Sequence, residues 1–181
     1  DDHMTLPGGE SRHRGSPFGM KTLNGYHHKG LAAVRASELT REALWEGLRG
    51  RQTYATTLAR TPLDVAVGPV GMGQQITVDR HDSLHSRRDV RVRFTLPASR
   101  GPARATVTLM RNGEELAAET VSGQDLREKR VEVTFTDAEP LEQAVLRDAP
   151  FHPDPFTVYY VRIEDSNVWT QWSSPIWLDL D

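Results

Sequence analysis

The sequence predicts a mainly β protein with a small α/β part near its N-terminal end. Three observations support this fold class. Apolar and polar residues alternate with a period of two in about eight short segments after residue 60. An Asn-Gly dipeptide at 112–113 separates two of these segments, and this is the strongest short hairpin signal in the chain. Before residue 60, one helix signal lies between two short strand-forming runs.

The small α/β part spans residues 30–57 and is predicted as strand, helix and strand. Residues 31–34 form a short apolar run. Thr40 stands at the expected N-cap of a helix, two leucines lie four residues apart on one helix face, and Gly50 follows as a stop signal. Residues 53–57, Thr-Tyr-Ala-Thr-Thr, favour a strand. The unit is expected to pack within an α/β layer.

The alternating segments predict an antiparallel β-sandwich of immunoglobulin-like type, because their number and spacing suit that fold. Their apolar positions are Leu63, Val65 and Val67; Ile76 and Val78; Val90, Val92 and Phe94; Val107 and Leu109; Leu116 and Ala118; Val131, Val133 and Phe135; Tyr159, Val161 and Ile163; Ile176, Leu178 and Leu180. Residues 137–155 are predicted as a long connection with one helical turn. We therefore expect a division into residues 1–60 and a sandwich at 61–181.

Composition narrows the classes of function. The net charge of −3 and the pI near 6.2 argue against nucleic acid as a partner. The chain has no cysteine, which excludes disulfides, Cys-ligated metals and thiol catalysis in it. That absence is compatible with the cytoplasm or the periplasm, and a periplasmic or secreted location is slightly favoured. No apolar run approaches the ~20 residues that span a membrane.

Three motifs carry a resemblance to a known family. The run ELTREALWEGLRGRQTYATT ends at Thr57, and WSSPIWLDL stands at Trp172 to Leu180. Asp1-Asp2-His3, followed by Pro7-Gly8, forms an Asp-x-His motif. In this order they resemble the last part of a bacterial family related to the PHP (polymerase and histidinol phosphatase) superfamily, itself labelled a domain of unknown function. The resemblance implies that residues 1–60 are the terminal strand-helix-strand segment of an incomplete PHP-type barrel.

The resemblance also implies a metal-dependent phosphoesterase, with Asp1 and His3 as two ligands of its metal centre. In an extended strand, residues two apart point to the same side, so both could face one ion. Carboxylate and imidazole together suit zinc, manganese or iron. Further ligands would come from the missing barrel portion or from a second chain, so the fragment alone would be inactive. The alternative is a frayed terminus with two solvated acids and a histidine.

Further N-terminal residues are weaker candidates. His28 could reach the metal face because His27-His28 immediately precede the first predicted strand, although adjacent histidines point in different directions. Arg12, His13 and Arg14 form a small basic cluster that could attract the phosphate of an ester substrate. The competing interpretation, which the surroundings of both groups favour, is an ordinary surface loop position.

Three patterns after residue 60 have competing interpretations. His81, Asp82 and His85 have metal-ligand spacing on a helix, but their surroundings predict an inter-strand loop. Arg87, Arg88, Arg91 and Arg93 could bind an anion, or could form the solvent face of an antiparallel sheet. Trp169, Trp172, Trp177, Tyr159 and Tyr160 could stack against a glycan, or could fill the sandwich core. The second candidate function is therefore a non-catalytic module that contacts a protein partner or a glycan.

Overall fold

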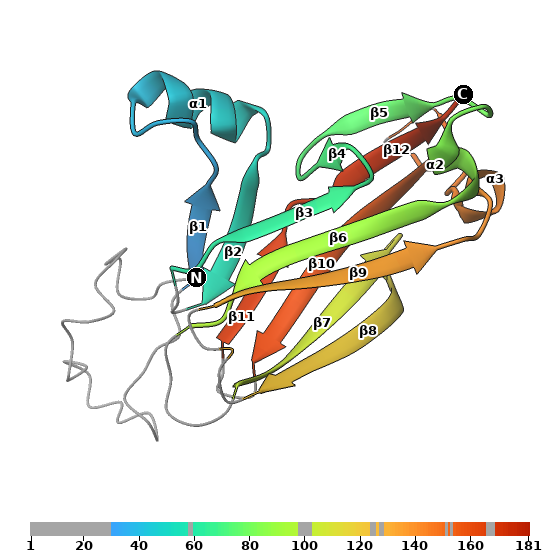
Figure 1. The fold of residues 1–181 in the computed structure, drawn as a ribbon. Coiled ribbons are helices and arrows are strands. Elements are labelled where there is room, and N and C mark those ends of the chain that lie inside the picture. The colour runs from blue at the N-terminus through green and yellow to red at the C-terminus, as the bar shows by residue number, and fades with distance from the viewer. Residues whose placement is uncertain are drawn as a thin grey trace, which may run out of the picture.

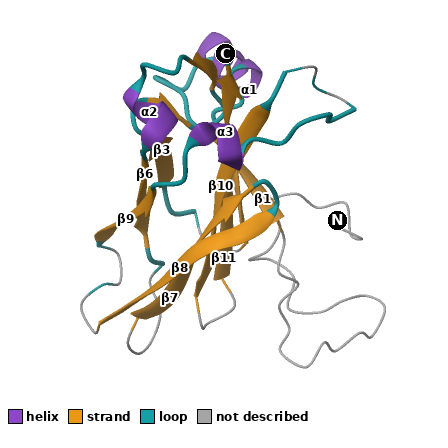
Figure 2. Ribbon diagram, turned by 90° about the vertical axis from the view of Figure 1, so that its right-hand side faces the viewer, coloured by secondary structure: helices purple, strands orange, loops and turns teal. Residues whose placement is uncertain are grey.

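The protein folds as two facing β-sheets with a strand-helix-strand unit at one edge (Figure 1). The computed structural model describes residues 30–57, 60–97, 103–123, 126, 129–150, 152, 154–165 and 169–181. Turned by 90°, the two sheets separate into layers, with two short helices at one end (Figure 2).

Within the described residues, the larger sheet has eight strands and the smaller has four. The larger consists of β1 (Gly30–Val34), β2 (Thr53–Thr57), β5 (Gln75–Val78), β7 (Ala103–Arg111), β8 (Glu114–Gly123), β10 (Phe156–Asp165), β11 (Trp169–Ser173) and β12 (Ile176–Leu180). The smaller consists of β3 (Leu63–Val67), β4 (Val70–Gly71), β6 (Arg88–Thr95) and β9 (Arg130–Asp137). The described strand pairs are antiparallel except for β5 with β12, which is parallel.

Strand β10 organises the larger sheet, because three strands pair with it. β7 pairs along one edge over residues 159–165. On the other edge, β12 pairs with residues 156–159 and β11 with residues 162–165. β2 then pairs with β11, and β1 with β2. The β1–β2 pair is therefore a continuation of the sandwich sheet.

In the part of the chain that the structure describes, three helices connect the strands. α1 (Arg41–Arg49) joins β1 to β2, and its N-cap is Thr40, whose hydroxyl accepts a hydrogen bond from the Ala43 amide at 3.3 Å. Gly50 is the C-cap residue. The single-turn helices α2 (Ser83–Ser86) and α3 (Leu141–Ala144) lie together at one end of the sandwich (Figure 2).

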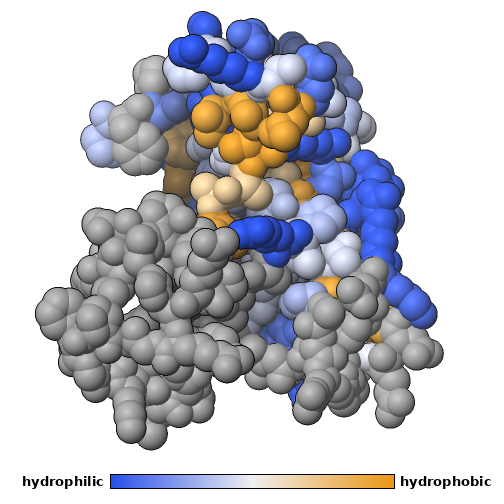
Figure 3. All heavy atoms as spheres, turned by 90° about the vertical axis from the view of Figure 1, so that its left-hand side faces the viewer, coloured by the Kyte–Doolittle hydropathy of each residue, from blue (hydrophilic) through white to orange (hydrophobic). Residues whose placement is uncertain are grey.

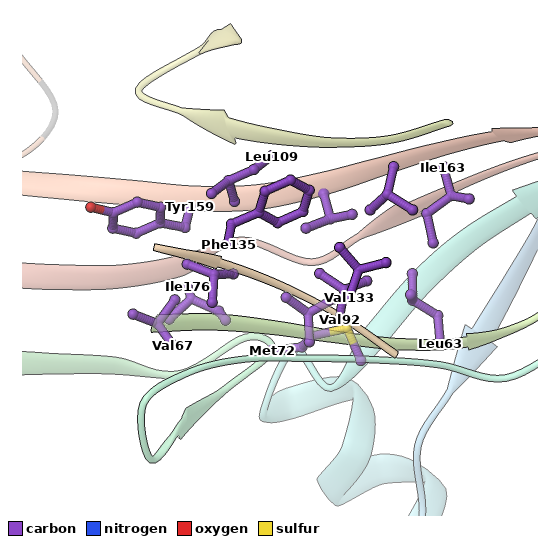
Figure 4. Packing of buried hydrophobic residues seen from close by; sticks show 14 of the residues in the cluster. Leu63, Val67, Met72, Val92, Leu109, Val133, Phe135, Tyr159, Ile163 and Ile176 are labelled. Atoms are coloured by element: carbon purple, nitrogen blue, oxygen red, sulfur yellow. The ribbon is translucent and has the colours of Figure 1, made fainter. Parts of the chain in front are cut away.

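The core lies between the two sheets and follows the alternation in the sequence. Residues of β6 and β9 alternate between buried and more exposed positions along each strand. Figure 4 shows side chains of both sheets meeting in this core, among them Val92 and Val133 from the smaller sheet and Leu109 and Ile163 from the larger. Fully burying one such side chain contributes about 1.5–3 kcal/mol, so this cluster provides the main driving force for folding.

The prediction of a mainly β fold with antiparallel sheets is confirmed, and the structure is consistent with a β-sandwich. The hairpin is confirmed as well, since Asn112 and Gly113 both have positive φ, of 55° and 89°, as a type I′ turn requires. The short strand β4 and the strand β11 were not predicted from the sequence. β11 was missed because only its tryptophans were considered, as glycan contacts or core residues.

The packing of residues 30–57 differs from the prediction. The order strand, helix, strand is confirmed, but β1 and β2 pair directly and antiparallel. An α/β layer with a crossover helix has parallel neighbours, so the expected α/β layer is wrong for this unit. The division at residue 60 stays a prediction, and the pairing of β2 with β11 joins residues on both sides of it.

Candidate functional site

The predicted metal ligands and phosphate contacts lie outside the residues that the structure describes: Asp1, His3, Arg12, His13, Arg14, His27 and His28. Across the described ranges, no group of three His, Cys, Asp or Glu side chains could hold a metal ion. The described part offers two other features with functional or structural consequences: an apolar surface on α1 and a buried ionic cluster between the sheets.

The α1 patch, which we define as Leu39, Trp45 and Leu48, is the most exposed set of large apolar side chains in the described chain. Their exposed fractions are 91%, 61% and 51%. Trp45 and Leu48 lie three residues apart and are therefore neighbours on the helix surface. Figure 3, which faces the side of β1 and α1, shows apolar atoms gathered beneath polar residues. Neighbouring exposed apolar side chains such as Trp45 and Leu48 are typical of a surface that contacts another protein.

Leu39 shows that this surface lacks a local partner among the described residues. It precedes the N-cap Thr40, a position from which an apolar side chain commonly packs on the residue four places into the helix, here Leu44. At 91% exposure, Leu39 makes no such contact. An open groove of about 620 Å³ lies between the β1–α1 connection and the helix. Arg35, Glu46 and Arg49 give it both charge signs, and none of the patch residues lines it.

A tight joint fixes the α1 unit to the sandwich. Gly73 has a φ of +79°, and a Cβ atom there would lie 2.2 Å from the carbonyl oxygen of Arg51. The Arg51 side chain donates a hydrogen bond to the Gly73 carbonyl at 2.9 Å, and its guanidinium lies 4.8 Å from the centre of the Trp177 ring. Arg35 adds an ion pair to Asp64 of β3 at 2.5 Å. The α1 patch is therefore held in a fixed position on the sandwich.

The buried ionic cluster consists of Arg88, Arg111, Asp137, Glu139 and Tyr159. The Tyr159 hydroxyl donates to Asp137 Oδ2 at 2.5 Å, and the Arg88 and Arg111 guanidinium groups lie 3.2 and 2.9 Å from the same oxygen. Arg88, which has no exposed surface, also donates to the carbonyl oxygens of Leu84, His85 and Glu139. The cluster links both sheets with α2 and the segment before α3. Its charged groups contact one another and backbone oxygens, and this arrangement favours a structural role.

The environment of this cluster shifts two pKa values. Burial raises the pKa of Asp137, but hydrogen bonds from Tyr159, the Glu139 amide and Arg111, with the charge of Arg88, outweigh it and lower the pKa overall. Burial and the hydrogen bond to Asp137 raise the pKa of Tyr159 well above its ordinary value of 10.0. Asp137 is therefore an anion and Tyr159 a protonated donor at neutral pH.

Acidification is expected to remove the stabilisation that Asp137 provides. Because its pKa is lower in the folded state, its contribution is fully present above the ordinary value of 3.8 and is lost as pH falls through the folded-state pKa. The free energy of unfolding, measured by urea titration at a series of pH values, should therefore fall below pH 3.8. In Asp137→Asn this part of the pH dependence should disappear.

Asp89→Asn is the matched control for that series. The pKa of Asp89 is also lowered, by hydrogen bonds from Thr136 and Arg87, but its side chain is half exposed. Solvent screening weakens such exposed interactions, so Asp89→Asn should change the pH dependence less than Asp137→Asn does. Equal changes in the two variants would contradict a special role of the buried carboxylate.

The basic stripe predicted on the solvent face of a sheet is confirmed in part. Arg87 and Arg91 are exposed, and Arg93 is partly exposed and pairs with Glu132 at 2.5 Å. The prediction is wrong for Arg88, which belongs to the buried ionic cluster. Arg88 shares the strand parity of Val90 and Val92, and α2 and the segment before α3 provide the oxygens that make its burial tolerable.

The His-Asp-x-x-His segment forms a one-turn helix where a loop was predicted. Asp82 is the N-cap residue of α2 and accepts a hydrogen bond from the Leu84 amide at 2.9 Å. His85 lies 3.3 Å from the Glu142 carboxylate of α3, while His81 is exposed. The two histidines therefore have different surroundings.

The aromatic residues divide between the core and the outer face of the larger sheet. Trp169 and Tyr159 are buried, as the core interpretation expects. Tyr160 and Trp177 are half-buried, and Trp172, opposite Arg162, is 38% exposed. An aromatic ring beside a guanidinium on an outer sheet face is compatible with ligand stacking.

Comparisons with known proteins place the chain beside uncharacterised sequences. Residues 9–82 match the family described as "Protein of unknown function (DUF3604)". An uncharacterised protein of Chlamydia muridarum is 32% identical over 153 residues, which cover 84% of this chain and 23% of that protein. Uncharacterised proteins of Chlamydia pneumoniae and Chlamydia trachomatis are 32% and 31% identical over the same shares. The chain thus spans about a quarter of the length of these relatives.

In the described residues, the structure has no helix long and apolar enough to cross a bilayer.

Proposed function

We propose that this chain is the C-terminal portion of a PHP-like metal-dependent phosphoesterase. In this proposal, residues 1–60 contribute the terminal segment of the catalytic barrel, and the immunoglobulin-like sandwich supports that barrel. The chain would be inactive alone, because most of the metal site would belong to the rest of the polypeptide.

The observation that carries the proposal is the exposed α1 patch, rigidly held yet without a partner in the described chain. A stable domain rarely leaves its largest apolar side chains clustered and uncovered. The relatives add support, because the matched region is only 23% of the length of the Chlamydia muridarum protein. A chain that belongs to a larger folded body accounts for both facts.

Asp1 and His3 are the metal ligands in this proposal, with His28 as a weaker third. The metal, whether zinc, manganese or iron, would supply a hydroxide nucleophile and bind the phosphate ester. Arg12, His13 and Arg14 would contact the phosphate through charged hydrogen bonds. Two protein ligands are fewer than the three that catalytic metal sites usually have, so further ligands must come from elsewhere in the protein.

The test is metal content and phosphate-ester hydrolysis of the complete protein encoded by the gene. We expect stoichiometric metal and hydrolysis of p-nitrophenyl phosphate by that protein, and neither in this chain alone. Asp1→Asn and His3→Ala should weaken metal binding by at least ~10- to 100-fold. Substitution of residues that only support metal ligands already has an effect of that size. His81→Ala is the matched control, since His81 is exposed and distant in sequence. A complete protein that binds no metal would refute the proposal.

The second candidate function is a non-catalytic binding module, and the exposed Trp172 beside Arg162 favours it. Glycans commonly stack on such rings, and Tyr160 lies on the same face because it is two residues from Arg162. Binding of a soluble glycan to this chain, together with a metal-free complete protein, would favour this function over the first.

A further inference from the structure

The open edge of β1 carries backbone groups that no described strand pairs with. The Arg35 amide donates to the Gln52 carbonyl at 2.8 Å, so these opposed residues form a hydrogen-bonded pair. Hydrogen-bonded and non-hydrogen-bonded pairs alternate in antiparallel ladders. Val34 and Ala32 therefore direct their N–H and C=O groups away from β2, toward the open edge. The Thr53 carbonyl, opposite Val34, accepts instead from Ser174, which agrees with this assignment.

β1 also lacks the features that keep edge strands from pairing. Its sequence, Gly-Leu-Ala-Ala-Val, has no charged residue and no proline. The edge strands β8 and β9 carry several charges, β5 alternates apolar with polar residues, and β4 is only two residues long. Charges, prolines and short length are the usual protection against strand addition. Of the described edge strands, β1 is the one that is entirely apolar and also long enough, at five residues, to pair with an added strand.

Helix α1 lies directly against the end of β1. Gly47 of α1 packs so closely on the end of β1 that a Cβ there would lie 2.6 Å from the Arg35 carbonyl oxygen and 2.8 Å from Val34 Cγ1. We call the β1 edge and the α1 patch together the β1–α1 surface. It combines unpaired backbone groups with exposed apolar side chains, as surfaces that accept an added strand do.

We propose that the β1–α1 surface receives an extended strand from the rest of the longer polypeptide, which pairs with β1 and covers the α1 patch. This inference rests on the proposed function only in its premise that the chain is part of a longer protein. Three quarters of the length of the relatives lies outside the matched region, and a corresponding part of this protein would supply the strand. Its high effective concentration favours this occupant over a second copy of the chain.

Amide hydrogen exchange tests the proposal on the complete protein and on this chain in parallel. In the chain alone, the Ala32 and Val34 amides should exchange rapidly, while the Ala33 and Tyr54 amides should be protected. In the complete protein, exchange at Ala32 and Val34 should slow by about 100-fold or more, because opening would require separation of the two parts. Rapid exchange of both amides in the complete protein would overturn the proposal.

Two variants of the complete protein probe the two halves of the surface. Ala32→Pro removes an outward N–H without breaking the β1–β2 ladder, and Ala32→Ser is its control because it keeps the amide. Leu48→Ser removes apolar area from the patch, and Leu116→Ser, at an exposed position on β8, is its control. Ala32→Pro and Leu48→Ser should each speed exchange at Val34 by tenfold or more, whereas their controls should not. Equal effects of variants and controls would argue against the surface.

Other occupants give distinct results. Slow exchange of both amides in the isolated chain, with the mass of a dimer, would assign the surface to a second copy and overturn the proposal. Slow exchange in a monomer would assign it to this chain's own residues, with the same consequence. None of these exchange and mass measurements depends on metal binding or hydrolysis. A result that refutes the proposed enzymatic function would therefore leave the proposal of strand addition intact.

Discussion

Arg88→Ala is expected to lower the free energy of unfolding by about 3–5 kcal/mol, because it removes a fully buried side chain and one of the two guanidinium groups that pair with Asp137. The substitution also removes donors from three backbone carbonyl oxygens at the α2–α3 end of the sandwich. Unfilled acceptors inside a protein cost additional free energy. Urea unfolding monitored by tryptophan fluorescence would measure the change.

Arg91→Ala is the matched control, since Arg91 lies on the same strand and faces solvent. Its substitution should change the free energy of unfolding by less than about 0.5–1 kcal/mol. Tyr159→Phe provides a second comparison, because it removes the hydrogen bond to Asp137 and the acceptor of Arg88 Nε but leaves both guanidinium groups beside Asp137. A loss below 1 kcal/mol for Arg88→Ala would show that the buried charge is dispensable.

The burial of Arg88 illustrates where sequence reasoning failed. The alternation of Val90, Val92 and Phe94 already places residue 88 on the inward side of the strand. Arginine is almost never fully buried unless it is paired, so its charge was taken as evidence for a solvent position. The partner Asp137 lies 49 positions away in the sequence, and only the pairing of β6 with β9 brings the two together. Non-local pairing of this kind leaves no signal in a local pattern.

The strands were easier to predict because their signals are local. Alternation over β6, β9 and β10 reflects one buried and one less buried face, and the Asn112-Gly113 turn requires positive φ values that few other residues adopt. The partners of β1 and β2 could not be predicted in the same way. An apolar run followed by a helix and a second strand is equally compatible with a parallel crossover and with an antiparallel pair, and the pairing of β2 with β11 decides between them.

The candidate site was less predictable than the fold. Asp1, His3 and the Arg12–Arg14 cluster were selected by motif, and they lie outside the described residues. The α1 patch was missed, because amphipathic spacing predicts that the apolar side of a helix is buried. Leu48 is instead half exposed and Trp45 more so. Sequence periodicity identifies the apolar face of a helix, but not whether its partner is in the same chain.

Gly73→Ala is expected to lower the free energy of unfolding by at least about 2 kcal/mol, because two separate costs combine. The residue has a φ of +79°, which L side chains rarely adopt. The added methyl group would also lie 2.2 Å from the Arg51 carbonyl oxygen and 2.6 Å from that of Gly50, so the backbone must move. Loss of the close approach should also release the Arg51 guanidinium from Trp177, which tryptophan fluorescence would report.

Gly113→Ala separates the two costs. Gly113 has a similar φ of +89°, but no atom lies within 4 Å of the position a Cβ would take. Its substitution should therefore cost only the conformational part, about 1 kcal/mol. The excess for Gly73→Ala then measures how strongly the joint holds α1 against the sandwich. Equal losses in the two variants would mean that the joint adds nothing, and the α1 patch would then lack the rigid support that makes it a preformed docking surface.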